Sequence, residues 1–249
     1  MSWMFAGHLL LGSAQIATYV YRLLRPHRVG VYGPSLSGKT TIDQYLTVPG
    51  DIDPIPLELR TSHAVQNGAF KAPRSTKKQV RWKGDRVPIT SSDIGGQQQY
   101  WNMWAEDIIN NHRDIIFYVV DERIIQSPQA AMEAVAGFQY IVDLVTNTKY
   151  PSTFNRKMRK KAKGWKPKVV CLLLNKMDVW WTPEADAMWS MGLKRQYRMV
   201  IPFQEELRRL RRAGIPTNVE AIAAQYGLNL ERAIVDTIHL ILGQPFSSC

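Results

Sequence analysis

Residues 29–40 read VGVYGPSLSGKT, an apolar run that leads into a glycine-rich loop ending in Lys39 and Thr40. The loop matches the pattern GxxxxGK followed by Ser or Thr, in which backbone N–H groups and the lysine contact phosphates and the hydroxyl binds Mg²⁺. The apolar run predicts a strand and the residues from Thr41 predict a helix, which is the context that the pattern requires. This motif alone indicates a nucleoside triphosphate without selecting the base.

Two more motifs follow, DIGGQ at Asp93 to Gln97 and NKMD at Asn175 to Asp178. In the first, the aspartate can hold the metal through water, the second glycine can direct its N–H at the γ-phosphate, and the glutamine can orient an attacking water. In the second, the aspartate can accept hydrogen bonds from both N1–H and N2–H₂ of guanine, donors that adenine lacks. The three motifs together predict a site that binds GTP and can hydrolyse it.

Strand and helix patterns alternate along the chain, which predicts a doubly wound α/β domain. Buried strands are predicted at 29–32, 115–120, 169–174 and 219–223, a hairpin at 79–82 and 87–91, and helices at 41–46, 128–145, 183–212 with a break near Pro202, and 228–242. We expect a P-loop GTPase domain with a mostly parallel six-stranded sheet and one antiparallel strand. Its nucleotide should lie at the carboxyl ends of the strands.

Residues 93–121 read DIGGQQQYWNMWAEDIINNHRDIIFYVVD. This stretch resembles the Arf branch of the small GTPases in DxGGQ, in Trp104 eleven residues after Asp93, and in a hydrophobic strand ending in Val-Val-Asp. The layout is also similar to that of the β subunit of the signal-recognition-particle receptor. The resemblance covers about residues 28–242 apart from two insertions. It implies a GTP/GDP switch with slow GTP hydrolysis, Mg²⁺ as a cofactor, and protein effectors and regulators as partners.

The resemblance also implies a role for each residue that matches the family's motifs. Nucleotide contacts are implied for Gly33, Ser35, Ser37, Gly38, Lys39, Thr40, Thr41, Gly96, Asn175, Lys176, Asp178 and the backbone N–H of Ala224. Mg²⁺ contacts are implied for Thr40, for Asp93 through water, and for Thr76. Catalytic roles are implied for Lys39, Gly96 and Gln97.

Thr76, assigned as the switch I threonine that contacts Mg²⁺, follows the family's spacing least closely. The reason is that residues 47–77 form a longer segment than in an Arf protein. Thr76 is favoured over Ser75 and Thr61, since it lies just before the strand that leads to the hairpin. Arg74 is a candidate arginine in cis for hydrolysis.

The cysteine content and the length of the chain limit its disulfides, its metal sites and its domain organisation. The 249 residues include two cysteines, Cys171 in a predicted strand and Cys249 at the end, which form neither a disulfide framework nor a metal set. The chain is expected to comprise an apolar N-terminal helix (1–26), the GTPase domain (27–243) with a basic insertion (149–168), and a short tail (244–249).

The N-terminal segment carries no charged side chain over residues 1–21, and Arg22, Arg25 and Arg28 follow it. As a helix its apolar part would be about 28 Å long, close to the hydrocarbon thickness of a bilayer. It can span a membrane, lie in the interface or pack on protein as an ordinary helix. The positive flank places the domain on the cytoplasmic face in the first case.

The formal charge is +11, and residues 149–168 contribute nine Lys or Arg and no Asp or Glu. This insertion is a solvated loop, a surface for anionic lipid, or a surface for nucleic acid, in which Phe154 and Trp165 would stack on bases. It enters a strand from its amino end, as the N-terminal segment does, so both are expected at the pole opposite the nucleotide, with the turn at Lys83 to Arg86. We therefore expect a membrane-associated GTPase. Its rivals are a ribosome- or RNA-associated GTPase and a GTP-bound scaffold that does not hydrolyse.

Overall fold

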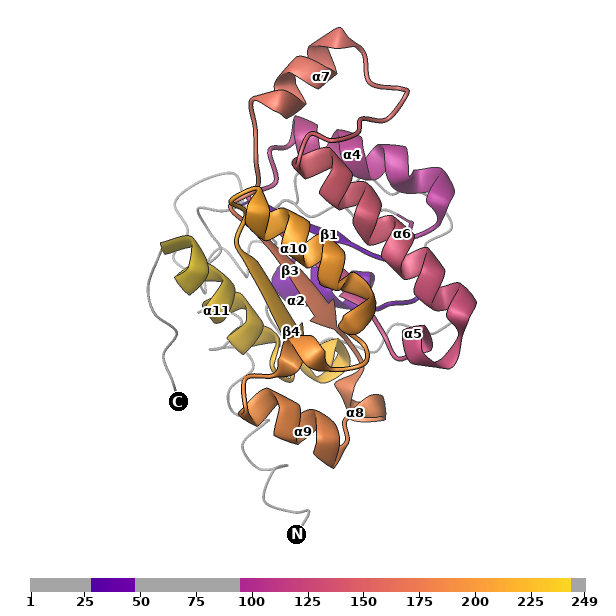
Figure 1. Ribbon diagram of the computed structural model, residues 1–249, viewed down its shortest axis with the longest axis vertical. Helices are drawn as coiled ribbons and strands as arrows, with labels where there is room; N and C mark the ends of the chain where they lie inside the picture. The colour runs from indigo at the N-terminus through magenta and orange to yellow at the C-terminus, as the bar shows by residue number, and fades with distance from the viewer. Residues whose placement is uncertain (1–27, 48–94, 243–249) are drawn as a thin grey trace, which may run out of the picture.

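The computed structural model describes residues 28–47 and 95–242 (Figure 1). Its described strands form one sheet: β1 (Val29–Tyr32), β2 (Ile115–Val120), β3 (Val169–Leu174) and β4 (Thr217–Ala221). They lie in the order β1-β2-β3-β4, and every neighbouring pair is parallel. Every residue of these strands is buried, as expected for a parallel sheet that is covered on both faces.

Helices cover both faces of this sheet. Ile116, Tyr118 and Val120 of β2 pack in one core with the helices α4 (Trp101–Asn110), α6 (Pro128–Val145) and α10 (Gln204–Arg212). Ile115 and Phe117 point the other way, into a second core with α2 (Lys39–Thr47) and α11 (Leu230–Leu242). The alternation follows from the two-residue period of a strand, and the result is the doubly wound arrangement that was predicted (Figure 1).

The described strands agree with the sequence prediction, with one shift. β1, β2 and β3 span the predicted residues, whereas β4 begins and ends two residues earlier than 219–223. The backbone leaves β4 because the N–H of Ala223 bonds to Leu228 instead of to β3. The predicted hairpin at 79–82 and 87–91, and with it the six-strand count and the antiparallel strand, lies outside the described residues.

The helix predicted over 183–212 with a single break was wrong in its middle. α9 (Pro183–Ser190) is followed by two short 3-10 turns, η2 (Lys194–Gln196) and η3 (Ile201–Phe203), before α10 begins. Gly192 takes a φ of +71°, a left-handed conformation that terminates α9 well before Pro202. The predicted helices at 41–46 and 228–242 match α2 and α11 to within two residues, and 128–145 matches α6.

The basic insertion contains a helix, α7 (Arg156–Lys163), which the sequence prediction left as a loop. The side chain of Asn155 caps it by accepting a hydrogen bond of 2.9 Å from the N–H of Met158. Phe154 and Ala162 anchor it, because both side chains are buried.

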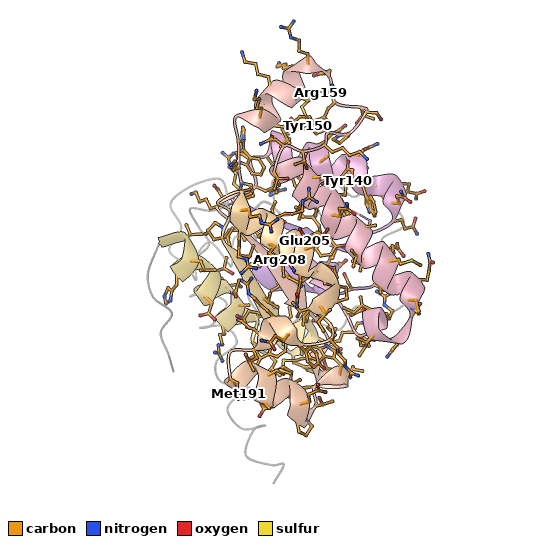
Figure 2. All side chains as sticks on the ribbon, in the orientation of Figure 1. Tyr140, Tyr150, Arg159, Met191, Glu205 and Arg208 are labelled. Carbon is orange, nitrogen blue, oxygen red and sulfur yellow. The ribbon has the colours of Figure 1, made fainter. Side chains whose placement is uncertain are left out.

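The insertion lies where the strands begin, as predicted. Asp114 accepts hydrogen bonds from the N–H of Arg28 at 3.2 Å and, through its carbonyl, from the N–H of Lys168 at 2.8 Å. Arg159 on α7 and Met191 after α9 lie at opposite ends of the molecule (Figures 1 and 2). Residues 1–26 and the turn at 83–86 lie outside the described residues. Among the helices that are described, none is long and apolar enough to cross a bilayer.

A buried ionic network ties β1 to α4. The guanidinium of Arg113 forms hydrogen bonds of 2.7 and 3.0 Å with the two carboxylate oxygens of Asp107 and one of 2.9 Å with the carbonyl of Val29. The hydroxyl of Tyr32 also donates to Asp107. The network holds the strand that leads into the phosphate loop against the helix that follows DIGGQ.

Candidate nucleotide-binding site

The carboxyl ends of the strands bring the sequence motifs to one edge of the sheet. The glycine-rich loop follows β1, Asp121 follows β2, Asn175 follows β3, and Ala224 lies in the turn after β4. Parallel strands open their connecting loops at the same edge, so motifs that are distant in sequence meet there.

The phosphate loop curves around its own carbonyl groups. Leu36 and Gly38 adopt positive φ values of 64° and 90°, which turns the chain sharply before α2. The ammonium of Lys39 donates to the carbonyl of Pro34 at 2.7 Å, and the hydroxyl of Ser37 donates to the same oxygen at 3.0 Å. Lys39 is 7% exposed, so its charge lies inside the curve of the loop.

The loop ends at the N-terminus of α2, which starts at Lys39 and includes Thr40 and Thr41. Exposed N–H groups and the helix dipole at such a terminus favour an anion. The hydroxyl of Thr40 is a hard oxygen donor of the kind that Mg²⁺ prefers. The other predicted contacts to the metal, Asp93 and Thr76, lie outside the described residues, and within the described ranges no cluster of three His, Cys, Asp or Glu side chains is suited to a metal ion.

The DIGGQ segment packs directly on the phosphate loop. A Cβ added to Gly96 would lie 2.2 Å from the backbone nitrogen of Ser35, so only glycine allows this approach. The indole N–H of Trp104 donates to the carbonyl of Gly95 at 3.1 Å and thereby fixes the segment on α4. Gln97 is exposed, and its side-chain oxygen accepts a hydrogen bond of 2.9 Å from Gln99. The structure thus places Gly96 against the loop and Gln97 at the edge of the site.

Asn175 of NKMD joins three loops. Its side-chain N–H donates to the carbonyl of Ser37 at 2.9 Å, and its side-chain oxygen accepts from the N–H of Ala224 at 2.9 Å. The indole of Trp180 donates to the Asn175 carbonyl at 2.7 Å and fixes the backbone. A Cβ on Gly38 would lie 2.1 Å from the Asn175 amide nitrogen, so the glycine makes room for this contact. The predicted contact of the Ala224 N–H with guanine stays a prediction, because here the group donates to Asn175.

The two charged residues of NKMD differ in their surroundings. Lys176 has a left-handed φ of 57°, and its ammonium lies 2.7 Å from Asp121 and 3.5 Å from Glu122. Asp178 is exposed in the first turn of α8 (Met177–Trp180). Its carboxylate is therefore open to a ligand.

Sequence reasoning missed Asp121 and Arg123 as site residues. Asp121 was noted only as the end of a strand, although its carboxylate binds both Lys176 and Arg123. Arg123 opens the short helix α5 (Arg123–Gln126) and reaches the carbonyl of Ser35 in the phosphate loop. The signal was their position just past a buried strand, where loop residues face the site.

No protein-family model matches the chain, and no curated protein matches its sequence. Among solved structures it is similar to the ADP-ribosylation-factor-like small COPII coat GTPase SAR1 of Encephalitozoon cuniculi in complex with GDP. That match has a TM-score of 0.49 and 14% identity, and it covers 96% of this chain and 91% of that one. The chain is also similar to the small GTPase Arl6 (BBS3) of Trypanosoma brucei with bound GppNp, with a TM-score of 0.48 and 16% identity, covering 88% of this chain and 99% of that one.

Both solved structures belong to the Arf family, which the motifs of this chain resemble. A parallel sheet with helices on both faces and a phosphate loop after its first described strand is the fold of a P-loop nucleotide-binding domain. Its motif residues agree with an Arf-like small GTPase.

Proposed function

We propose that the protein is an Arf-like molecular switch that binds GTP and GDP with Mg²⁺, hydrolyses GTP, and recruits or regulates a protein partner in one nucleotide state. The observation that carries this proposal is the bridge made by Asn175, which ties the guanine motif to the phosphate loop at Ser37 and to the turn at Ala224. A base and its phosphates are recognised together only if these loops keep a constant separation.

The hydrolytic roles follow from the positions of the charged and polar groups. Lys39 supplies a positive charge inside the loop, and Gly96, which packs on the loop backbone, is assigned to donate its N–H to the γ-phosphate, so both would stabilise negative charge as it builds up. Gln97 orients the attacking water from the edge of the site. Thr40 would hold Mg²⁺, with Asp93 and Thr76 as further contacts; when bound, the ion would supply positive charge between the β- and γ-phosphates.

Equilibrium binding tests the nucleotide assignment. The full-length protein is titrated with fluorescent GDP in the presence of Mg²⁺, and GTP, GDP and ATP are added as competitors. We expect GTP and GDP to displace the probe and ATP to leave it bound. Lys39→Ala should abolish binding, whereas Lys166→Ala, which removes an exposed lysine where the strands begin, should not. Equal competition by ATP, or no binding of the probe, would overturn the proposal.

State-dependent capture then identifies the partner. The protein is loaded with GDP or with a non-hydrolysable GTP analogue, and proteins that bind only one form are identified. A scaffold subunit that does not switch would capture the same proteins in both states.

A second proposal concerns the surface formed by α7 and Arg28, which we call the basic pole. Five of its charges, Arg156, Lys157, Arg159, Lys160 and Lys163, are exposed, and no acidic residue occurs within 149–168. The basic pole lies at the edge where the strands begin, away from the nucleotide. Such a surface suits an anionic membrane, with the site facing the cytosol and residues 1–25 as an additional anchor. RNA is the rival ligand for the same charges.

A further inference from the structure

Arg123 is held beside the phosphate loop by a carboxylate. Its Nε donates to both oxygens of Asp121 at 2.9 and 3.0 Å, and its Nη2 donates to the carbonyl of Ser35 at 2.5 Å. The Asp121 side chain is 2% exposed and also binds Lys176, so it is a buried anchor for two cations. This orientation costs Arg123 little further side-chain entropy when it acts on a ligand.

The position of this guanidinium relative to the loop is specific. Lys39 donates to the carbonyl of Pro34 and Arg123 to the carbonyl of Ser35, so the two cations lie on consecutive peptide groups of the loop. Gly96 packs against the peptide group between Pro34 and Ser35, the one that Lys39 contacts. A Cβ added to Gly96 would lie 2.2 Å from the carbonyl carbon of Pro34 and from the nitrogen of Ser35. Lys39 and Gly96, the groups expected to contact the γ-phosphate, therefore lie on the peptide group next to the one that Arg123 contacts.

The arginine keeps donors for a further acceptor. An arginine side chain carries N–H groups on three nitrogens, and the contacts above use Nε and Nη2. Within the described part of the chain, no hydrogen bond involves Nη1. The Arg123 side chain is 33% exposed, so a ligand can reach part of it.

We propose that Arg123 is an arginine finger supplied in cis, which donates hydrogen bonds to the transferring phosphoryl group; this inference rests on the proposed GTPase activity. In the step, a bond forms between the water oxygen and the γ-phosphorus, and the bond from this phosphorus to the β–γ bridging oxygen breaks. The bridging oxygen leaves with the electron pair on GDP, and the water proton passes to the phosphate product. Arg123 stays protonated throughout and stabilises the charge that builds up on these oxygens.

Two variants separate this role from mere support of the loop. Arg123→Gln keeps an N–H donor for the carbonyl of Ser35 but removes the charge, whereas Arg123→Lys keeps the charge. Arg209→Ala is the matched control, because Arg209 also pairs with a carboxylate, that of Asp143 at 2.5 Å, and its side chain is 23% exposed. Arg74→Ala tests the other arginine, which the sequence suggested as a candidate in cis for hydrolysis.

Single-turnover GTP hydrolysis of the full-length protein is measured, together with GDP and GTP affinities and the binding of aluminium fluoride to the GDP form. Arginine fingers contribute about 10³- to 10⁵-fold, so Arg123→Gln should slow hydrolysis at least ~100-fold. Both affinities should stay within about threefold, because the group acts on charge that develops during the reaction. Arg123→Gln should also lose aluminium fluoride binding, and Arg123→Lys should recover part of the rate.

Three results would overturn the inference, and the first two of them leave the GTPase assignment standing. Hydrolysis by Arg123→Gln at the same rate as by Arg209→Ala would show that the positive charge of Arg123 does not contribute to the rate. A parallel fall in GDP affinity, GTP affinity and rate would show that Arg123 only supports the loop. Wild-type protein that binds GTP without any turnover would exclude an effective arginine in cis. Wild-type protein that binds no guanine nucleotide would remove the proposed function itself.

Discussion

The side-chain amide of Asn175 donates to the carbonyl oxygen of Ser37 across 2.9 Å, which joins the loop after β3 to the loop after β1. Asn175 is 3% exposed and satisfies the N–H of Ala224 with its other atom. One side chain therefore sets the spacing between the guanine motif and the phosphate loop.

Asn175→Ala should weaken GDP and GTP binding alike, because it leaves a carbonyl and an N–H without their partners. Each unsatisfied buried group costs about 1–3 kcal/mol, so we expect a loss of about 10- to 100-fold in affinity for both nucleotides. Titration with fluorescent nucleotides measures it, and Asn110→Ala at the opposite edge of the sheet is the control. Unchanged affinity would show that the bridge is dispensable.

Asp178→Asn should exchange the base that is recognised. Under the proposed function the carboxylate of Asp178 accepts hydrogen bonds from two guanine donors, and an amide there opposes one of them with its own N–H groups. A site built for hydrogen bonding rejects a mismatched partner by about 10⁴-fold or more, so GTP affinity should collapse while xanthosine triphosphate binds. Competition between the two nucleotides on wild type and variant is the measurement. GTP binding that is unaffected would remove NKMD as the guanine site.

Gln97→Leu should preserve nucleotide affinity and slow hydrolysis, since the proposed role of this side chain is to orient the attacking water. The effect should grow in the presence of an activating partner. The neighbouring Gln98 is also exposed, which makes Gln98→Leu a control of the same size and chemistry. Phosphate release is measured for both variants. Equal rates would favour a scaffold that does not use Gln97.

Asp107→Ala should destabilise the domain by about 3–5 kcal/mol near neutral pH, because it leaves the buried guanidinium of Arg113 without its counter-charge. Replacing both residues with apolar side chains, as in Asp107→Leu with Arg113→Met, should cost less. Unfolding in denaturant measures both. A double variant that is less stable than Asp107→Ala would contradict this account.

The same pair predicts the acid side of the stability curve. Burial alone would raise the pKa of Asp107, but the hydrogen bonds and charge of Arg113, with hydrogen bonds from Tyr32 and Asn111, lower it. A lowered pKa means that the stabilisation is complete above the unfolded pKa of about 4 and is lost as pH falls through the folded value. Wild type should therefore lose stability below about pH 4, and Asp107→Asn should lose less there than wild type. Identical acid profiles would exclude this linkage.

The membrane proposal predicts two separable contributions. Deleting residues 1–25 should release the protein from membranes without loss of GTP binding, and replacing Lys157, Lys160 and Lys163 with Ala in that protein should abolish residual binding to anionic vesicles. Each charge contributes about 1 kcal/mol at such a surface. Vesicle flotation measures it, with Arg208→Ala on α10 as the control (Figure 2). Binding to RNA with a steep salt dependence and no flotation would favour the RNA-associated rival.

The central strands and α6 were predictable from the sequence. β2 and β3 are buried on both faces, so they occur as unbroken apolar runs, and α6 starts at Pro128 after the capping side chain of Ser127. The motif residues were predictable for the same reason, because nucleotide recognition depends on short spacings within one loop.

Other elements depend on contacts that no local pattern displays. β4 carries the buried polar residues Thr217, Asn218 and Glu220, which are neutralised or hydrogen-bonded by Lys194 and Arg195 from a distant turn. Its start was therefore misplaced. Six of the eight residues of α7 are cations, and its apolar stripe is only one residue wide, with Phe154, Met158 and Ala162 four residues apart and packed on the core, so the sequence shows this helix weakly.

Arg123 is the clearest case of a role that packing creates. Arg123 lies 88 residues from Ser35 in the chain, and nothing in the residues around it indicates that the two are neighbours in the fold. They meet because β1 and β2 are hydrogen-bonded neighbours and their carboxyl ends open at the same edge. Local spacing specifies what a loop can bind, whereas the order of strands in the sheet specifies which distant charge lies beside it.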